Sequence, residues 1–533
     1  MPTQISWEEA HTQAMKILAT LSVEEKVKLV SGKRWPLSQD VVGFIDANNA
    51  VPEFKGLVIQ DAPTGIRFAL GTSAFSSSIN VASTWDKELM LKHGMAIGEE
   101  AHGKGVNIWL GPCVNMARSP LGGRIWEAQG ADPYLSGVSA ALQIKGVQSN
   151  GVISTVKHFI LNDQEFMRTK QNSIIDDRTL REIYMKPFQM AVDADVGAIM
   201  TSYNKVLGEW AGQSKFVITE LLKTEIGFKG IVMTDWWAVN QETSKGDVSL
   251  IANSGLDMVM PGDESYADLR SVWGNGRLVG LVESGKVPLD RLNDMVTRVL
   301  TVWIKAGQND GKFPERDLGA SRKRNVQSNH KSVIREVGAA SSVLLKNDGS
   351  LPLGKTIRSI AVIGTDAAPP ANGVYGDASK KQGEFFSDHG CVDGTVAQGW
   401  GSGTTHFPYI IAPVDGIKVC TEANDIQLIA SLTNSVEEGK IAAKNADIAI
   451  VFVYANAGEG YIEYGETIEG DRTSLNLWSG GNELVLAVAN VKKTVVVIHA
   501  PGAVNLPWRN HENVVGIIFA GFPGQETGNS IAD

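Results

Sequence analysis

Short apolar runs alternate with amphipathic stretches along residues 12–305. The apolar runs are rich in β-branched side chains and predict strands at 55–61, 105–111, 152–159, 197–204 and 230–235. Stretches with apolar positions at helical spacing lie between them, at 86–102 and 177–193. The second of these begins after Asp176-Asp177, residues typical of a helix start. Alternation of this kind predicts an α/β protein with a parallel sheet, and the length favours a (β/α)8-type barrel over residues 1–305.

The pattern changes after residue 305. Residues 306–330 are polar, aperiodic and interrupted by Gly and Pro, as expected of a linker. A second α/β domain, expected to be a sandwich, follows over residues 331–533. Its predicted strands are apolar on both faces, which is typical of parallel strands covered by helices; they lie at 359–364, 447–454, 494–500 and 514–521.

Composition narrows the function classes. The 533 residues carry a formal net charge of -10, which argues against a nucleic-acid or anionic-membrane partner. No apolar run has the length of a membrane-spanning helix, and the first residues lack the pattern of a signal peptide. The three cysteines, Cys113, Cys391 and Cys420, form neither a disulfide framework nor a zinc motif, and there is no N-glycosylation sequon. We therefore expect a cytoplasmic protein, with secretion as the alternative.

Polar side chains gather at the ends of the predicted barrel strands: Asp61, Lys157, His158, Tyr203 and Asp235. The carboxyl ends of barrel strands are where active sites lie. Trp236 follows Asp235, and a carboxylate beside an aromatic ring suits glycoside hydrolysis, because the ring can pack against the apolar face of a sugar. Alternatively, Asp235 caps a helix. Two adjacent basic groups, Lys157 and His158, are costly to bury unless something binds them.

Several motifs occur together and in order: VIQDAPTGIR around Asp61, GGRIWEAQGADP around Arg124, STVKHFILNDQEFMR around Lys157 and His158, IVMTDW around Asp235, and then GLDMVMPGD, GWGSGT and AGFPGQETGNSIAD. As a set they resemble glycoside hydrolase family 3, in particular its fungal-type β-glucosidase branch. The resemblance covers essentially the whole chain. It implies a retaining β-glucosidase that needs no metal or organic cofactor, with Asp235 as the nucleophile.

The resemblance also implies roles for other residues. Asp61 would bind sugar hydroxyls, Arg124, Lys157 and His158 would act on them as cationic donors, and Arg168 and Tyr203 would orient the sugar or the nucleophile. Met200 and Trp236 would form apolar walls, and Trp35 and Tyr461 would line the leaving-group side. Glu459 in the segment GEGY would be the acid/base, with a pKa raised by partial burial. Glu463, Glu466 and Glu469 in the same loop are expected to be solvated.

One competing motif points to nucleotide binding. Residues 349–356, GSLPLGKT, match the P-loop pattern. A P-loop opens a helix, whereas the next residues, IRSIAVIG, predict a strand. We therefore interpret this segment as a turn into the second domain, and nucleotide binding stays the least favoured alternative.

Two departures from the family pattern affect the expectations. Cysteines common in secreted relatives are replaced, for example by Thr201 and Ala211, which agrees with a reducing compartment. Relatives of this branch continue beyond the segment that ends at Asp533, so we expect a C-terminally truncated second domain.

The open alternatives are β-xylosidase or β-N-acetylglucosaminidase activity on the same fold, and an inactive, truncated sugar-binding relative. The sequence leaves the oligomeric state undetermined.

Overall fold

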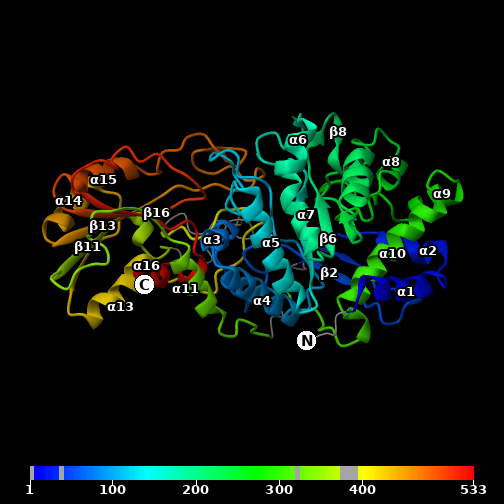
Figure 1. Cartoon of the computed structure of the whole chain (residues 1–533), viewed down its shortest axis with the longest axis horizontal. Coiled ribbons are helices and arrows are strands. Elements are labelled where there is room, and N and C mark those ends of the chain that lie inside the picture. Colours follow the sequence, from blue (N-terminus) through cyan, green and yellow to red (C-terminus); the bar gives the residue numbers. More distant parts are fainter. Residues whose placement is uncertain (1–4, 35–40, 319–323, 372–393) are drawn as a thin grey trace.

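The computed structural model describes residues 5–34, 41–318, 324–371 and 394–533. Figure 1 shows two lobes side by side along the long axis of the molecule, with the N-terminal residues in one and the C-terminal residues in the other. Each lobe is built on its own six-stranded sheet. Among the helices of the described ranges, none is long and apolar enough to cross a membrane.

The first sheet closes on itself. Its order is β1-β2-β3-β4-β6-β9, with bounds β1 Gly43–Ile45, β2 Leu57–Gln60, β3 Ile108–Trp109, β4 Ile153–Phe159, β6 Ala198–Thr201 and β9 Ile231–Met233. Isolated bridges complete the ring: Met233 pairs with Met258, Val259 with Ser31, and Lys33 with Phe44. The prediction of a (β/α)8-type barrel is confirmed, with one departure: β1 runs antiparallel to β2, whereas the other pairings from β2 to β9 are parallel.

Helices surround this barrel (Figure 1). They include α1 Trp7–Leu18, α2 Val23–Val30, α4 Lys87–Gly103, α5 Pro133–Gln148, α7 Lys186–Asp193 and α10 Leu289–Lys305. Their starts follow from the sequence, since Asp86 and Asp132 accept hydrogen bonds from first-turn N–H groups of α4 and α5. The helix predicted over 177–193 is divided into α6 Asp177–Thr179, a π-helical turn Leu180–Tyr184 and α7. Helices α4 and α5 can approach closely because Gly94 has no side chain. A Cβ at that position would collide with the backbone of Gln143.

The predicted linker is anchored to the first domain. The fully buried Lys104 donates hydrogen bonds to Asp317 Oδ2 (3.0 Å) and to the carbonyl of Arg324 (2.6 Å). The next helix, α11 His330–Ala340, packs against α4. His330 lies between two carboxylates of α4, with Nδ1 2.8 Å from Glu100 and Nε2 3.1 Å from Glu99.

The second sheet has the order β10-β17-β16-β13-β11-β12. Its strands are β10 Val343–Asn347, β11 Ser359–Ile363, β12 Gln427–Ser431, β13 Ile448–Tyr454, β16 Thr494–His499 and β17 Val514–Phe519, all parallel to their neighbours except β10. Helices α14 Val436–Lys444 and α15 Gly481–Ala489 cover one face, and α13 Pro413–Ala423 and α16 Thr527–Ala532 pack on the other. The second domain is thus a three-layer α/β sandwich. Its expected truncation stays a prediction.

The segment 349–356 leads into strand β11 and opens no helix. Gly349 has a positive φ of 98°, as a turn residue can. No helix N-terminus follows the turn to direct backbone N–H groups toward a phosphate. The interpretation of this segment as a turn into the second domain is confirmed.

Candidate active site

Asp235 lies two residues after the end of strand β9, at the carboxyl edge of the barrel. Its side chain is buried, and Oδ1 accepts a hydrogen bond from the N–H of Trp236 at 2.7 Å. Oδ2 has no hydrogen-bond partner among the described residues and lies 3.6 Å from His158 Nε2. Burial raises the pKa of Asp235 to about 6, although Arg168 and Arg124 oppose the shift. One oxygen is therefore held while the other is free to react.

Asp61 and Lys157 form a buried ion pair next to it. Asp61 follows β2 and Lys157 lies in β4, and Nζ donates to Oδ1 at 2.7 Å. Lys157 is 1% exposed and Asp61 is 8% exposed. Asp61 Oδ1 also accepts the N–H of Ala62 at 2.9 Å. The ammonium therefore keeps two donors, and the carboxylate keeps its second oxygen, for a ligand.

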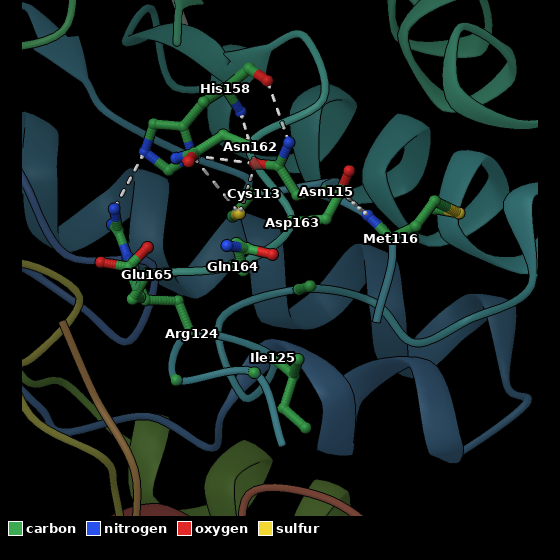
Figure 2. A pocket seen from close by; sticks show the side chains of 13 residues that line it. Cys113, Asn115, Met116, Arg124, Ile125, His158, Asn162, Asp163, Gln164 and Glu165 are labelled. Carbon is green, nitrogen blue, oxygen red and sulfur yellow. Dashed lines mark hydrogen bonds between the residues drawn. The ribbon is translucent and has the colours of Figure 1, made fainter. Parts of the chain in front are cut away.

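His158 is held by Asn115. The imidazole Nδ1 lies 2.9 Å from Asn115 Oδ1, and Asn115 Nδ2 donates to the His158 carbonyl at 3.0 Å. Since the amide oxygen can only accept, Nδ1 carries the proton and Nε2 faces Arg124 Nη1, 3.3 Å away. Figure 2 shows Asn115 and Arg124 on opposite sides of the ring, in the wall of a small pocket.

The prediction that His158 is a cationic donor is wrong. Burial, together with the positive charges of Arg124 and Lys157, holds the pKa of His158 well below its usual value. The ring is therefore neutral, and Nε2 presents a lone pair to its neighbours. Arg124 and Lys157 supply the positive charge at this edge of the barrel.

Arg124 is fixed by a partner that the sequence prediction missed. Its Nε and Nη2 donate to the two carboxylate oxygens of Glu127, both at 2.8 Å, and Nη2 also donates to Ser402 Oγ at 3.1 Å. Glu127 is fully buried. A bidentate pair of this kind holds the guanidinium in one orientation, and Nη1 is left to face His158 and Glu459.

Glu459 comes from the second domain and enters the same space. Its Oε1 accepts a hydrogen bond from Arg168 Nη1 at 2.7 Å and lies 3.5 Å from Arg124 Nη1, while Oε2 accepts the N–H of Ser402 at 2.7 Å. The side chain is buried. A carboxylate of the second domain is thereby held against two arginines of the barrel.

The prediction of a raised pKa for Glu459 is wrong for this arrangement. Burial favours the protonated form, but Arg124, Arg168 and the bonds from Ser402 outweigh it and hold the pKa well below its usual range. The reason is that two guanidinium groups lie within ion-pair distance of one carboxylate. This arrangement therefore favours the ionised form of Glu459.

Arg168 and Tyr203 stack beside Asp235. The guanidinium carbon of Arg168 lies 4.4 Å from the centre of the Tyr203 ring. Burial, followed by the charge of Asp235, raises the pKa of Tyr203, so its hydroxyl stays protonated and can donate to that carboxylate. Both residues therefore lie beside Asp235, and their role in orienting the sugar or the nucleophile stays a prediction.

The residues predicted to form apolar walls or to line the leaving-group side make fewer contacts with the charged groups of the site. Trp236 is partly buried and its indole donates to the Val42 carbonyl at 2.8 Å, whereas Met200 is buried in the barrel core. Tyr461 is 47% exposed, and its hydroxyl lies 3.4 Å from Arg67 Nη2. Trp35 lies outside the described residues.

The other glutamates of the Glu459 loop differ from one another. Glu463 and Glu466 are exposed, as predicted, but Glu469 is not simply solvated. Its Oε2 accepts the N–H of Met167 in the first domain at 2.8 Å. Asp471 lies beyond it, in the short hairpin β14 Thr467–Ile468 and β15 Asp471–Arg472, and accepts three backbone N–H groups of the first domain.

Sequence reasoning missed Glu127, Glu165, Asn115 and Ser402. Glu127 and Glu165 were open to detection, because each lies three residues from an arginine of the site, Arg124 or Arg168. Asn115 and Ser402 carried no such signal, since their contacts join segments 43 and 57 or more residues apart. Within the described ranges, no group of three or more His, Cys, Asp or Glu side chains is placed to hold a metal ion.

The fold and site define a class. Two carboxylates, one at a barrel strand end and one on a neighbouring domain, meet among buried groups that can bind sugar hydroxyls, which is the arrangement that a glycoside hydrolase requires. Comparison with known proteins agrees. Residues 46–302 match the glycosyl hydrolase family 3 N-terminal domain and residues 342–533 match its C-terminal domain. The chain belongs to glycosyl hydrolase family 3.

Similar proteins include the probable beta-glucosidase L of Aspergillus terreus, 42% identical over 99% of this chain and 70% of that protein. Beta-glucosidase 1 of Aspergillus aculeatus is 38% identical over 99% of this chain and 64% of its own length. Among solved structures, the beta-D-glucoside glucohydrolase from Trichoderma reesei superposes with a TM-score of 0.92 at 40% identity, covering 100% of this chain and 72% of the other.

Proposed function

We propose that this protein is a retaining, exo-acting β-glucosidase that releases terminal β-D-glucosyl residues from cellobiose, short oligosaccharides and aryl glucosides. The observation that carries the proposal is the meeting of Asp235, with a free buried oxygen, and Glu459, held by Arg124 and Arg168. The similar proteins named as β-glucosidases support the choice of glycon. Such a role belongs to the breakdown of cellulose-derived sugars.

The first chemical step forms a glycosyl-enzyme. Asp235 Oδ2 attacks the anomeric carbon, the bond from that carbon to the leaving oxygen breaks, and Glu459 gives its proton to the leaving oxygen. In the second step Glu459 removes a proton from water, the water oxygen attacks the anomeric carbon, and the bond to Asp235 breaks. Two inversions at the same carbon retain its configuration.

Glu459 has to be protonated for the first step, although its arginine partners favour the ionised form. The negative charge of Asp235 works against them, since each carboxylate raises the pKa of the other when both are ionised. Once Asp235 has become an ester, that charge is gone and the pKa of Glu459 decreases. The same pair of charges therefore favours an acid before glycosylation and a base after it.

The sugar at the carboxyl edge of the barrel is bound by charged side chains and by the neutral imidazole of His158. Asp61 accepts bonds from hydroxyl groups, Lys157 and Arg124 donate to hydroxyl oxygens, and Nε2 of His158 accepts a bond. Because these groups are fixed by partners before the sugar arrives, little conformational entropy is lost on binding. Tyr461, on the exposed rim, contacts the leaving group.

A panel of nitrophenyl β-glycosides tests the glycon. Glucoside hydrolysis with retention is expected, and a xyloside or N-acetylglucosaminide hydrolysed more efficiently than the glucoside would reassign it. Asp235→Ala should lose at least a hundredfold in kcat on an activated aryl glucoside. Glu459→Ala should spare good leaving groups and be rescued by azide. Rescue of Glu463→Ala, which changes an exposed glutamate of the same loop, would move the acid role to Glu463.

We also propose that the protein works in a reducing compartment. Cys113 is buried and Cys420 is exposed, and both are free thiols. An exposed free thiol is typical of proteins kept under reducing conditions. Activity in the cell lysate is expected, and its presence in the culture supernatant instead would contradict the proposal.

A further inference from the structure

Glu165 connects the two domains at the acid/base. It lies three residues before Arg168, and its side chain is almost fully buried, at 2% exposure. Its Oε2 accepts the Arg168 Nη1–H at 2.8 Å and the N–H of Gly460 at 3.0 Å. Gly460 directly follows Glu459, so one carboxylate oxygen of the barrel holds both the backbone of the acid loop and the arginine that contacts the acid.

The same nitrogen of Arg168 serves two carboxylates. Nη1 lies 2.8 Å from Glu165 Oε2 and 2.7 Å from Glu459 Oε1. The guanidinium cannot turn away freely, because its face stacks on the Tyr203 ring. Any change in the charge of Glu165 therefore alters how strongly this guanidinium attracts a negative charge on Glu459.

The backbone around Glu165 is also fixed. Its own N–H and that of Phe166 donate to Asp471, at 3.1 and 2.9 Å, and the N–H of Met167 donates to Glu469. Carboxylates of the second domain thus accept hydrogen bonds from the loop that carries Glu165. Glu165 in turn accepts a hydrogen bond from the loop that carries the acid. The contacts are reciprocal across the domain boundary.

We propose that Glu165 is a positioning residue for the acid/base, one that holds Arg168 and the Gly460 backbone against Glu459 and offsets part of the positive charge of Arg168. The inference rests on the proposed function and goes beyond it, because it assigns a role to a group that does not touch the reacting atoms. With Glu165 ionised, Glu459 can keep its proton to a higher pH than it could beside an unopposed guanidinium.

The charge of Glu165 depends on pH. Burial raises the pKa of Glu165 to about 7, with Arg168 and Arg124 opposing and the charge of Glu459 adding to the increase. Glu165 therefore carries its charge, and offsets that of Arg168, only near and above pH 7, which is where the basic limb is measured. Interaction between two charges is mutual, so the charge of Glu165 raises the pKa of Glu459 in turn. The titratable and charged groups that face the pair from the neighbouring elements are Arg124, Glu127, Lys157, His158, Arg168, Tyr203, Asp235, Glu469 and Asp471.

The test is the pH dependence of kcat/KM for Glu165→Gln, whose side chain keeps the shape and an oxygen acceptor. On an alkyl glucoside, which needs the acid, the basic limb should move to lower pH by about one unit. On 2,4-dinitrophenyl β-glucoside, which needs little protonation, the rate at the optimum should change less than threefold. Glu469→Gln is the matched control, because it also removes a carboxylate that holds this loop but does not touch Arg168; its basic limb should stay in place.

Either of two results with Glu165→Gln would overturn the inference. One is an unchanged basic limb, and the other is an equal loss of rate at every pH and for both leaving groups, as a merely structural role would give. If this variant fails to fold, Glu165→Gln combined with Arg168→Gln removes the charge pair together. The inference expects the basic limb of kcat/KM for this double variant to lie at a higher pH than that of the unmodified protein. A basic limb at the same or a lower pH refutes the inference. Absence of glucoside hydrolysis by the unmodified protein would instead refute the proposed function, and the inference with it.

Discussion

The contact between the domains can be weakened at one side chain. Asp471 accepts the N–H groups of Gly123 at 2.7 Å, Glu165 at 3.1 Å and Phe166 at 2.9 Å, all from the first domain. Asp471→Ala removes three bonds at once. At a net value of about 0.5–1.5 kcal/mol for each bond, the variant should lose about 2–4 kcal/mol of stability. For domains of this size that corresponds to a decrease in Tm of about 5–10 °C.

The same change should affect catalysis selectively. The hairpin that carries Asp471 continues from the acid loop, and the N–H of Gly458 in that loop donates to the Gly470 carbonyl at 3.4 Å. When the hairpin loosens, Glu459 is presented less accurately, whereas Asp235 on the barrel is unaffected. We expect kcat/KM for an alkyl glucoside to decrease about tenfold, equivalent to about 1.4 kcal/mol, and that for a dinitrophenyl glucoside to change less than threefold.

Calorimetry and steady-state kinetics on the two glucosides measure both effects. Asp447→Ala is the control, because Asp447 also accepts two backbone N–H groups, of Arg358 at 2.7 Å and Ser359 at 3.0 Å, but within the second domain. That variant should lower Tm without changing the ratio of rates on the two substrates. The reasoning is refuted if Asp471→Ala keeps both the Tm and the ratio of the unmodified protein.

Other predictions concern single contacts. Gly401→Ala should lower kcat on alkyl glucosides at least tenfold, because a Cβ there would collide with the Cβ of Glu459 and lie 2.9 Å from its Oε2; unchanged kinetics would contradict this. His330 is buried, which lowers its pKa, but its bonds to Glu100 and a neighbouring glutamate outweigh burial and raise it above 6.5. Its stabilising contribution is therefore complete below about pH 6.5 and is lost as the pH rises through the higher folded-state pKa, so His330→Gln should lower Tm at pH 6 more than at pH 9. Lys157→Met leaves a buried carboxylate unpaired and should raise KM for glucosides and destabilise the protein by about 3–5 kcal/mol; a change below 1 kcal/mol in denaturant unfolding would contradict it.

Much of the fold was predictable because it depends on local patterns. Each of the predicted apolar runs of the barrel contains a strand, and Asp235 lies two residues after the end of the last of them, β9. The antiparallel β1 was not predicted, since Gly43–Ile45 is too short to show a period of its own. The break in the helix over 177–193 was likewise invisible, because its apolar positions keep helical spacing on both sides of the π-helical turn.

The candidate site was predictable as a set of residues and not as a set of charge states. Motifs named Asp235, Glu459 and the sugar-binding groups, but neither the neutral state of His158 nor the ionised state of Glu459 followed from them. Both states depend on burial and on charges that come from other elements. The sequence likewise predicts a solvated Glu469, because its partner, the N–H of Met167, lies 302 residues away and leaves no local signal.

The sequence by itself determined the class of fold, the order of the domains and the strand end that carries Asp235. These follow from apolar periodicity and short motifs, which act over a few residues. Only the tertiary structure decided how the acid is held, since Arg168 and Glu459 are 291 residues apart and meet within 2.7 Å. Desolvation and Coulomb interactions depend on distance in space, and the folded arrangement of the two domains sets that distance.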